Sequence, residues 1–200
     1  MKPPSPSLAP SPKLHRGAGE VRIIGGQWRR TKLSVAQQPG LRPTPDRVRE
    51  TLFNWLGQDL QGWRCIDAFA GTGALGLEAA SRGAAEVVLC ELEQALVLQL
   101  KQHVQRLNAT SVQVSRGDGV ALLQQHGVAR WDLVFLDPPF QANLFDKALQ
   151  AAAKAVKADG WVYLEAPQSW TDADLTPLGF RVYREMKAGS VYAHLLQPIA

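Results

Sequence analysis

The stretch DAFAGTGALG, residues 67–76, decides the fold of this chain. It follows the apolar run 64–68 (RCIDA), which is typical of a buried strand, and it leads into a helical pattern over 74–82. Glycines between a strand and a helix let the backbone turn sharply and approach a ligand at the helix N-terminus. The stretch therefore predicts a strand–loop–helix unit with a ligand site at the end of its strand.

Outward from this loop, strand-like and helix-like segments alternate. The patterns predict strands at 64–68, 86–91, 111–115, 131–137 and 160–165, helices near 74–82, 93–107, 119–126 and 143–157, and a closing hairpin over 180–197. Such alternation indicates an α/β fold with a doubly wound, mostly parallel sheet that carries helices on both faces. The antiparallel hairpin at its end is the less ordinary part of this architecture.

The N-terminal third divides into segments of different composition. Residues 1–19 are rich in Pro and Ser and predict a disordered tail. Residues 20–200 predict a single domain, made of a basic, hairpin-like arm (20–40), a helical segment (41–60) and an α/β core (61–200). In the helical segment we expect Thr44 to cap the N-terminus and Gly57 to end the helix.

Composition limits the class of protein. The 200 residues, 46% of them hydrophobic, suit one globular domain, and no apolar run approaches the roughly 20 residues of a membrane span. There is no secretory signal pattern, and Cys65 and Cys90 lie in strand-like runs, which favours reduced, buried thiols in a cytoplasmic protein. The four histidines have no metal-ligand spacing, so no metal is expected.

The glycine loop leaves two cofactor classes to compare. Gly71, Gly73 and Gly76 have the spacing of the dinucleotide fingerprint, and Glu91 follows about twenty residues later, as in an NAD-dependent dehydrogenase. However, Asp67 at the strand end would place a negative charge beside a pyrophosphate. S-adenosylmethionine has no phosphate and carries an ammonium and a sulfonium, so an acid suits it better. We therefore favour S-adenosylmethionine as the cofactor.

Further acids follow the next two strands. Glu91 can accept hydrogen bonds from both ribose hydroxyls, and Asp118 can accept one from the adenine amino group, although an Asp at this point is also an ordinary helix N-cap. The predicted cofactor-binding residues in this region are Asp67, Phe69, Gly71, Gly73, Glu91 and Asp118.

The fourth strand ends in Asp137-Pro138-Pro139-Phe140, which we interpret as the catalytic loop. Proline fixes φ and removes a backbone donor, so that nearby oxygens are available as acceptors. The Asp137 carboxylate and the Pro138 carbonyl could accept both hydrogens of a base amino group, and the base could stack on Phe140. Two acceptors stabilise the positive charge that develops on this nitrogen during in-line attack on a methyl carbon.

The basic front of the chain suggests a polyanionic partner. The net charge of +4 is unevenly distributed, because residues 1–64 carry an excess of seven positive charges and the remainder is acidic. A Gly25-Gly26 hinge in the arm and the surrounding charges favour RNA contact over a merely solvated face. The predicted RNA-binding residues of the arm are Arg22, Trp28, Arg29, Arg30 and Lys32. Arg47 and Arg49, on the helix, are expected to pair with Glu50 or to face solvent.

Together these stretches resemble a known family. RIIGGQWRRTKL, LRPTPDRVRETLFNWL, DAFAGTGALGLEAASRGA, FLDPPF and REMKAGSVY, from about Val21 to Tyr192, are similar to the bacterial 16S rRNA (guanine 966-N2)-methyltransferase family. The resemblance implies a seven-stranded, Rossmann-like class I methyltransferase fold and N2-methylguanine formed in the small ribosomal subunit. It further implies that Arg42 and Thr44 close over the cofactor and the target, Thr44 toward the cofactor and Arg42 toward the RNA.

Three alternatives remain open at this point. A DNA or RNA methyltransferase acting on adenine N6 or cytosine N4 would use the same Asp-Pro-Pro-aromatic loop, although 200 residues leave little room for DNA target recognition. A dehydrogenase would use the glycine loop. A non-catalytic ribosome-assembly factor would keep the fold and bind RNA only, but the intact Asp67, Glu91 and Asp137 argue against it. A monomer is the default expectation.

Overall fold

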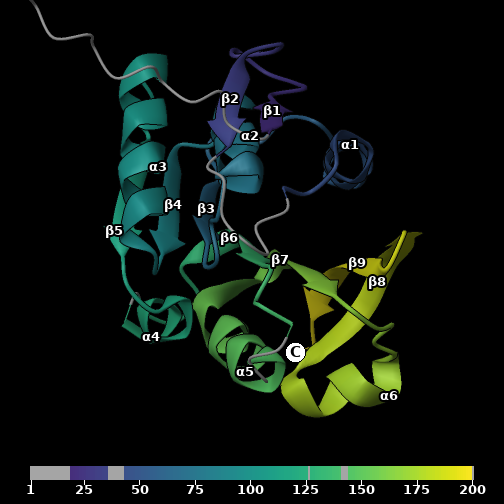
Figure 1. The fold of residues 1–200 in the computed structure, drawn as a ribbon. Helices are drawn as coiled ribbons and strands as arrows, with labels where there is room; N and C mark the ends of the chain where they lie inside the picture. Colours follow the sequence, from purple (N-terminus) through teal and green to yellow (C-terminus); the bar gives the residue numbers. More distant parts are fainter. Residues whose placement is uncertain (1–18, 36–42, 126, 141–143, 200) are drawn as a thin grey trace, which may run out of the picture.

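A computed structural model describes residues 19–35, 43–125, 127–140 and 144–199 of the chain. Its main feature is a seven-stranded sheet in the order β5-β4-β3-β6-β7-β9-β8 (Figure 1). Strands β3 to β7 all run parallel to one another, and β9 is antiparallel to both β7 and β8. The order reverses beside β3, and ligands of doubly wound sheets bind where the order reverses. The predicted α/β fold with a seven-stranded, mostly parallel sheet is confirmed.

The elements follow the predicted alternation closely. The strands of the main sheet are β3 (Arg64–Asp67), β4 (Glu86–Glu91), β5 (Val112–Arg116), β6 (Trp131–Leu136), β7 (Val156–Ala166), β8 (Phe180–Ala188) and β9 (Val191–Pro198). The helices are α1 (Asp46–Trp55), α2 (Ala74–Ser81), α3 (Gln94–Leu107), α4 (Gly119–Gln125), α5 (Phe145–Ala155) and α6 (Asp172–Leu175), with a 3₁₀ turn η1 (Thr176–Leu178). None of the helices in the described ranges has the length and apolar composition of a membrane-spanning segment.

Helices cover both faces of the sheet and form two cores. On one face, α1, α2 and α3 pack on Cys65, Leu89, Phe135 and Tyr163. On the other face, α4, α5 and α6 pack on the strand side chains that point in the opposite direction, such as Val134. Successive strand residues point to opposite faces, so strands such as β3, β4 and β6 contribute to both cores. Both cysteines are buried and free.

The transition from the helix near 143–157 to the strand at 160–165 was predicted too late in the chain. The helical pattern over 143–157 was expected to continue two residues further than it does, but α5 ends at Ala155 and Val156 already belongs to β7, where it pairs with Trp131. A register shift between Trp131 and Leu133 then brings Leu133 opposite Trp161. Val156 is β-branched and therefore fits a pleated strand. The short α6 and η1 were not predicted.

The cap of α1 also differs from the prediction. Thr44 does not cap this helix; the N-cap position is Pro45, whose backbone is extended and whose carbonyl accepts hydrogen bonds from Val48 and Arg49. The hydroxyl of Thr44 instead donates to Glu165, 121 residues later, at 2.7 Å. A long-range partner has therefore replaced the local one that the sequence pattern suggested.

The N-terminal arm forms a small antiparallel sheet from β1 (Gly19–Arg22) and β2 (Lys32–Val35). Its connecting loop docks on α2 and is not a free hinge: the amides of Ile24 and Gly25 donate to Glu78, at 2.9 and 2.7 Å. A Cβ at Gly26 would lie 1.8 Å from the carbonyl oxygen of Ser81. The glycine pair therefore permits close contact with α2, and the predicted hinge is corrected to a docking loop.

Candidate active site

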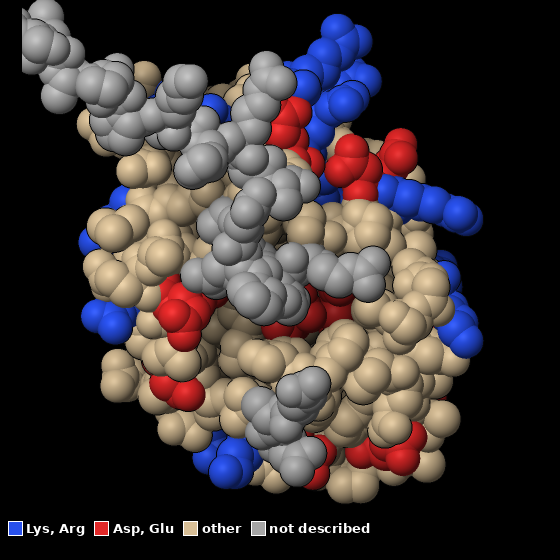
Figure 2. Space-filling model, in the orientation of Figure 1, with Lys and Arg blue, Asp and Glu red and all other residues tan. Residues whose placement is uncertain are grey.

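Three acids meet at the carboxyl ends of neighbouring strands. Asp67 ends β3, Asp137 follows β6, and Glu165 is the penultimate residue of β7. Each lies two residues after a side chain of the α1–α3 core, namely Cys65, Phe135 and Tyr163, so strand periodicity places all three acids on that face. Acidic atoms lie recessed near the middle of the face in Figure 2. We call Asp67, Asp137 and Glu165 the acidic triad.

Asp67 is 1% exposed and joins the sheet to α2. Its Oδ2 accepts a hydrogen bond from the Gly76 amide at 3.2 Å, whereas Oδ1 is buried and has no hydrogen bond of normal geometry within the described residues. Burial raises the pKa of Asp67 to about 7; the Gly76 and Phe69 amides lower it in part, and the charges of Glu91 and Glu165 raise it further. A buried acid of this kind favours a cationic partner.

The glycine loop runs between Asp67 and Glu91. The Gly71 amide donates to Glu91 Oε2 at 2.8 Å, and the Glu93 amide donates to Oε1 at 2.9 Å, which fixes this carboxylate and leaves it able to accept further hydrogen bonds. Gly73 is the N-cap of α2 with φ of 78°, a conformation that favours glycine. Phe69 is half-buried and packs against the α4–α6 core. The loop therefore presents fixed polar groups beside the first acid.

Asp118 lies one strand further along the same edge. Its Oδ1 accepts a hydrogen bond from the Ala121 amide at 2.8 Å, in the first turn of α4. The capping role weighed from the sequence is therefore present. The role at an adenine ring stays a prediction, because a carboxylate that caps a helix retains acceptor capacity on its other oxygen.

The loop after β6 carries the predicted catalytic residues. Asp137 is half-buried and Pro138 is buried, whereas Pro139 and Phe140 are exposed. Burial raises the pKa of Asp137 well above its usual range, and the charges of Glu165 and Asp67 add to this effect. The loop thus joins an acceptor carboxylate to an accessible aromatic ring.

An aromatic row supports this exposed ring. Phe140 lies 6.3 Å from Phe145 between ring centroids, and Phe145 lies 6.0 Å from Trp170. Phe140 is 39% exposed, so part of its surface is accessible to a ligand while its neighbour is packed on the α4–α6 core. Neither Phe145 nor Trp170 was identified from the sequence, because their relation to the loop depends on how α5 and the segment after β7 pack.

The predicted RNA-binding residues of the arm lie at its surface. Arg22, Arg29, Arg30 and Lys32 are exposed, and Lys32 pairs with Glu20 at 2.7 Å. Trp28 is half-buried and packs against the α1–α3 core, which leaves it less free as a stacking platform than predicted. Basic side chains gather at the top of the face that holds the recessed acids (Figure 2). The Arg42 prediction lies outside the described residues, as does nearly all of the predicted tail at 1–19.

The family model named Conserved hypothetical protein 95 matches residues 21–197. Ribosomal RNA small subunit methyltransferase D of Escherichia coli strain K12 is 42% identical over 188 residues, and the match covers 92% of each chain. The chain belongs to this methyltransferase family. The protein of the same name from Haemophilus influenzae is 40% identical over 187 residues, which are 90% of this chain and 94% of the relative. A solved structure from Escherichia coli, 42% identical, covers 91% of this chain and 99% of its own with a TM-score of 0.79.

Family membership confirms the predicted resemblance and the methyltransferase class, and it makes the dehydrogenase interpretation of the glycine loop wrong.

A buried network of hydrogen bonds and ion pairs joins the arm to the acidic triad. Arg49 is fully buried and donates to the Thr44 carbonyl, to Glu78 and to Asp46. The expectation that Arg49 pairs with Glu50 or faces solvent is therefore wrong.

Glu78 is the centre of this network. It is fully buried, pairs with Arg49 at 3.2 Å and with Arg82 at 2.9 Å, and accepts the two amides of the arm loop. The sequence could have indicated that both charges are buried. Glu78 is a lone charge in an otherwise apolar helix, and Arg49 lies one turn from the apolar Leu52 and Phe53.

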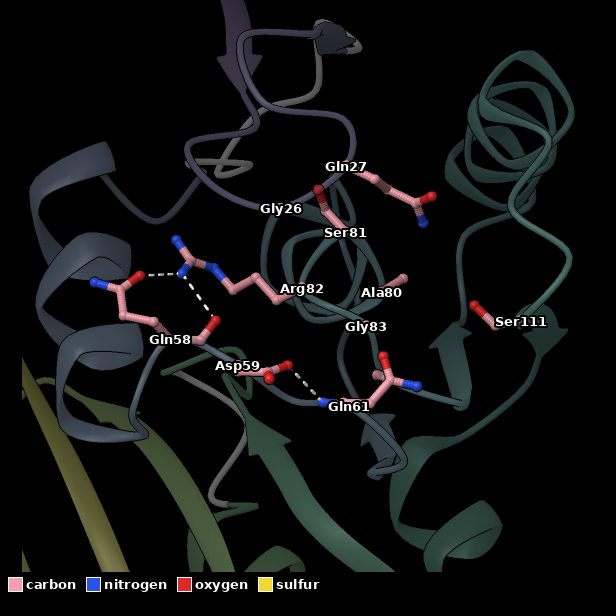
Figure 3. Close-up of a pocket in the computed structure, with 11 residues that line it drawn as sticks. Gly26, Gln27, Gln58, Asp59, Gln61, Ala80, Ser81, Arg82, Gly83 and Ser111 are labelled. Atoms are coloured by element: carbon pink, nitrogen blue, oxygen red, sulfur yellow. Dashed lines mark hydrogen bonds between the residues drawn. The ribbon is translucent and has the colours of Figure 1, made fainter.

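A polar pocket elsewhere does not belong to the acidic triad. It lies between the arm and α2, near the amino ends of β3 and β5, and Figure 3 shows the guanidinium of Arg82 donating hydrogen bonds to Gln58 at its edge. Its lining residues are Gly26, Gln27, Gln58, Asp59, Gln61, Ala80, Ser81, Arg82, Gly83, Ala84 and Ser111. Because doubly wound sheets bind ligands at the carboxyl ends of their strands, the triad and not this pocket is the candidate active site.

Proposed function

We propose that this chain transfers a methyl group from S-adenosylmethionine to the exocyclic N2 nitrogen of a guanine of 16S ribosomal RNA. The substrate would be the small ribosomal subunit in the cytoplasm, and the resemblance suggests guanine 966 as the target. The observation that carries the proposal is the juxtaposition of Asp67 and Asp137 on one face of the sheet, with the accessible ring of Phe140 beside Asp137. Relatives named as ribosomal RNA methyltransferases support the substrate class.

The residues at the end of β3 and β4 fit the proposed cofactor. The buried Oδ1 of Asp67 lacks a hydrogen bond of normal geometry, and a cationic ammonium group would supply it with a partner. Glu91 is held by two amides and would accept from ribose hydroxyls, and Asp118, Phe69 and the glycine loop would surround the nucleoside. The family resemblance also assigns Thr44, whose hydroxyl donates to Glu165, to the cofactor site. When bound, the cofactor supplies an electrophilic methyl group on a sulfonium.

The catalytic loop would orient and activate the base. The Asp137 carboxylate and the Pro138 carbonyl would accept the two hydrogens of the amino group, while the base stacks on Phe140. Acceptors that are fixed before the reaction stabilise the positive charge on the nitrogen without reorganising during the step. After transfer, the carboxylate of Asp137 can take up the proton that the alkylated nitrogen releases. Its raised pKa makes it a better base than a solvated aspartate.

Cofactor affinity should fall as the pH is lowered through the pKa of Asp67. With that pKa at about 7, the acid is mostly ionised at pH 8 and mostly protonated at pH 6, and the protonated form no longer attracts a cation. We expect calorimetric titration to give a dissociation constant roughly tenfold weaker at pH 6 than at pH 8, with proton release on binding near pH 6.5. In Asp67→Asn the affinity should be weak at both pH values. A wild-type affinity that does not change between them would contradict this role.

Two arginines of the arm should contribute to RNA binding. Arg29 and Arg30 are exposed and make no ion pair within the described part of the chain, so both are available to phosphates. Replacing both with Ala should weaken binding to the small subunit and reduce the slope of log K against log salt by about one to two. The matched control is Arg181→Ala with Arg184→Ala on β8, far from the arm in Figure 1. An unchanged salt slope in the arm variant would remove these residues from the RNA interface.

The direct test is methyl transfer from labelled S-adenosylmethionine to three acceptors: small subunits that lack the modification, protein-free 16S RNA, and DNA. Digestion and mass analysis would identify the labelled nucleoside. N2-methylguanosine at one site, formed on particles and hardly on naked RNA, would support the whole proposal. Transfer to DNA or free RNA alone would keep the methyltransferase and overturn the ribosomal substrate.

A further inference from the structure

Glu165 is the member of the acidic triad that the proposed function does not use. It is 5% exposed and lies at the end of β7, next to β6. The parallel register pairs Leu136 with Leu164, so one further step brings Asp137 beside Glu165. The charge of Glu165 raises the pKa of Asp137, which agrees with this proximity. The carboxylate of Glu165 is therefore adjacent to that of Asp137, which would accept a hydrogen bond from the amino group of the base.

The position of Glu165 is fixed by two donors. Its Oε1 accepts hydrogen bonds from the Thr44 hydroxyl at 2.7 Å and from the Tyr163 hydroxyl at 2.9 Å. The Thr44 carbonyl in turn accepts from the buried Arg49 at 3.2 Å, so the donor side is itself anchored. This carboxylate is pre-organised and has little rotational freedom.

Anchoring Thr44 does not explain why this residue is an acid. A glutamine amide oxygen could accept the same two hydrogen bonds without a buried charge. No Lys or Arg pairs with Glu165 among the described residues, and burial raises its pKa. Burying an unpaired charge beside two other acids is unfavourable, so an acceptor at this place indicates a donor on a ligand.

The edge of guanine supplies such a donor. Guanine presents two adjacent donors, the N2 amino group and N1–H, whereas adenine and cytosine present a ring-nitrogen acceptor beside their amino group. We propose that Glu165 selects guanine by accepting a hydrogen bond from N1–H while Asp137 accepts from the amino group. This assignment rests on the proposed function and adds the group that discriminates among bases. An amino base without N1–H would turn a ring-nitrogen lone pair toward the carboxylate and be rejected.

The test compares guanine with 2-aminopurine, which keeps the 2-amino group but has an acceptor at N1. Small subunits would be reconstituted from 16S RNA with either base at the target position, and kcat/KM for methyl transfer would be measured with the wild-type protein. We expect guanine to be preferred by roughly 10- to 100-fold, as for loss of one buried hydrogen bond to a charged group. A ratio near one overturns the proposal without any variant. No transfer to guanine at all would instead overturn the proposed function.

The variant Glu165→Gln sharpens the comparison. Its amide oxygen can keep the bonds to Thr44 and Tyr163, while its NH₂ group presents a donor where the carboxylate offered an acceptor. We expect the preference for guanine over 2-aminopurine to fall at least tenfold, with cofactor affinity within a few fold of wild type. Glu185→Gln, an exposed position on β8, is the matched control and should keep the wild-type ratio.

Two results with Glu165→Gln would overturn the assignment. A slower reaction with an unchanged base ratio would mean that Glu165 only anchors Thr44 and α1. A large loss of cofactor affinity with an unchanged ratio would place Glu165 with Asp67 in the cofactor site, since its charge also acts on that acid. Thermal unfolding of each variant would accompany the kinetics, and the wild-type ratio remains decisive if Glu165→Gln is unstable.

Discussion

Methyl transfer by the Asp137→Ala variant should be about 10²- to 10³-fold slower than in the wild type, with cofactor affinity within a few fold. Asp137 would hold the amino nitrogen and stabilise the charge that develops on it, so the loss should appear in kcat and not in cofactor binding. The measurement is single-turnover transfer to small subunits, with cofactor affinity determined by calorimetry.

Two further variants make this expectation specific. Asp159→Ala changes an exposed acid at the start of β7 and should keep wild-type activity. Asp137→Asn keeps one acceptor oxygen but no negative charge, and should lie between alanine and wild type. Equal activity of Asp137→Ala and wild type would remove Asp137 from the mechanism.

Glu78→Ala should lower the free energy of unfolding by about 3–5 kcal/mol, the range for removing one partner of a buried ion pair. The change leaves Arg49 and Arg82 buried without their shared acid, and it removes the acceptor of the Ile24 and Gly25 amides. Urea denaturation would measure the loss, which is a large part of the stability of an ordinary domain.

A local readout accompanies this stability measurement. Since Glu78 joins the arm to α2, limited proteolysis should cut the arm of the variant sooner than the rest of the domain. Glu50→Ala, an exposed acid of α1, is the matched control and should cost less than about 1 kcal/mol. A loss of similar size in both variants would show that the buried network is not specially stabilising.

One chain of hydrogen bonds leads from Glu78 to the neighbourhood of Asp137, the two residues changed in these predictions. Glu78 bonds to Arg49, Arg49 bonds to the Thr44 carbonyl, and the Thr44 hydroxyl bonds to Glu165 beside Asp137. The network therefore links the docking of the basic arm to the placement of the acidic triad. An arm variant that binds RNA less well should accordingly be checked for a change in kcat as well as in KM.

Much of the candidate site could be predicted from the sequence. Asp67, Glu91 and Asp137 each end an apolar run, and carboxyl ends of parallel strands meet at one edge of a sheet, so their convergence follows from the strand pattern alone. Glu165 ends a similar run, WVYLE, and the same reasoning could have included it. It was not predicted because Ala166 and Pro167 follow it, whereas the Pro-Pro-aromatic motif that indicates a base site follows Asp137.

The sequence by itself determined the alternation of strands and helices, the glycine loop, the acids at strand ends and the basic arm, because each of these is encoded in local periodicity or composition. Only the tertiary structure decided the partners of Thr44, Arg49 and Glu78. Their hydrogen bonds span 121, 29 and 54 residues, and side chains of ordinary local sequence acquire such partners only when the chain packs. Hydrogen-bonding groups are satisfied by whatever lies nearest in space, and local sequence cannot specify a partner that distant parts of the chain supply.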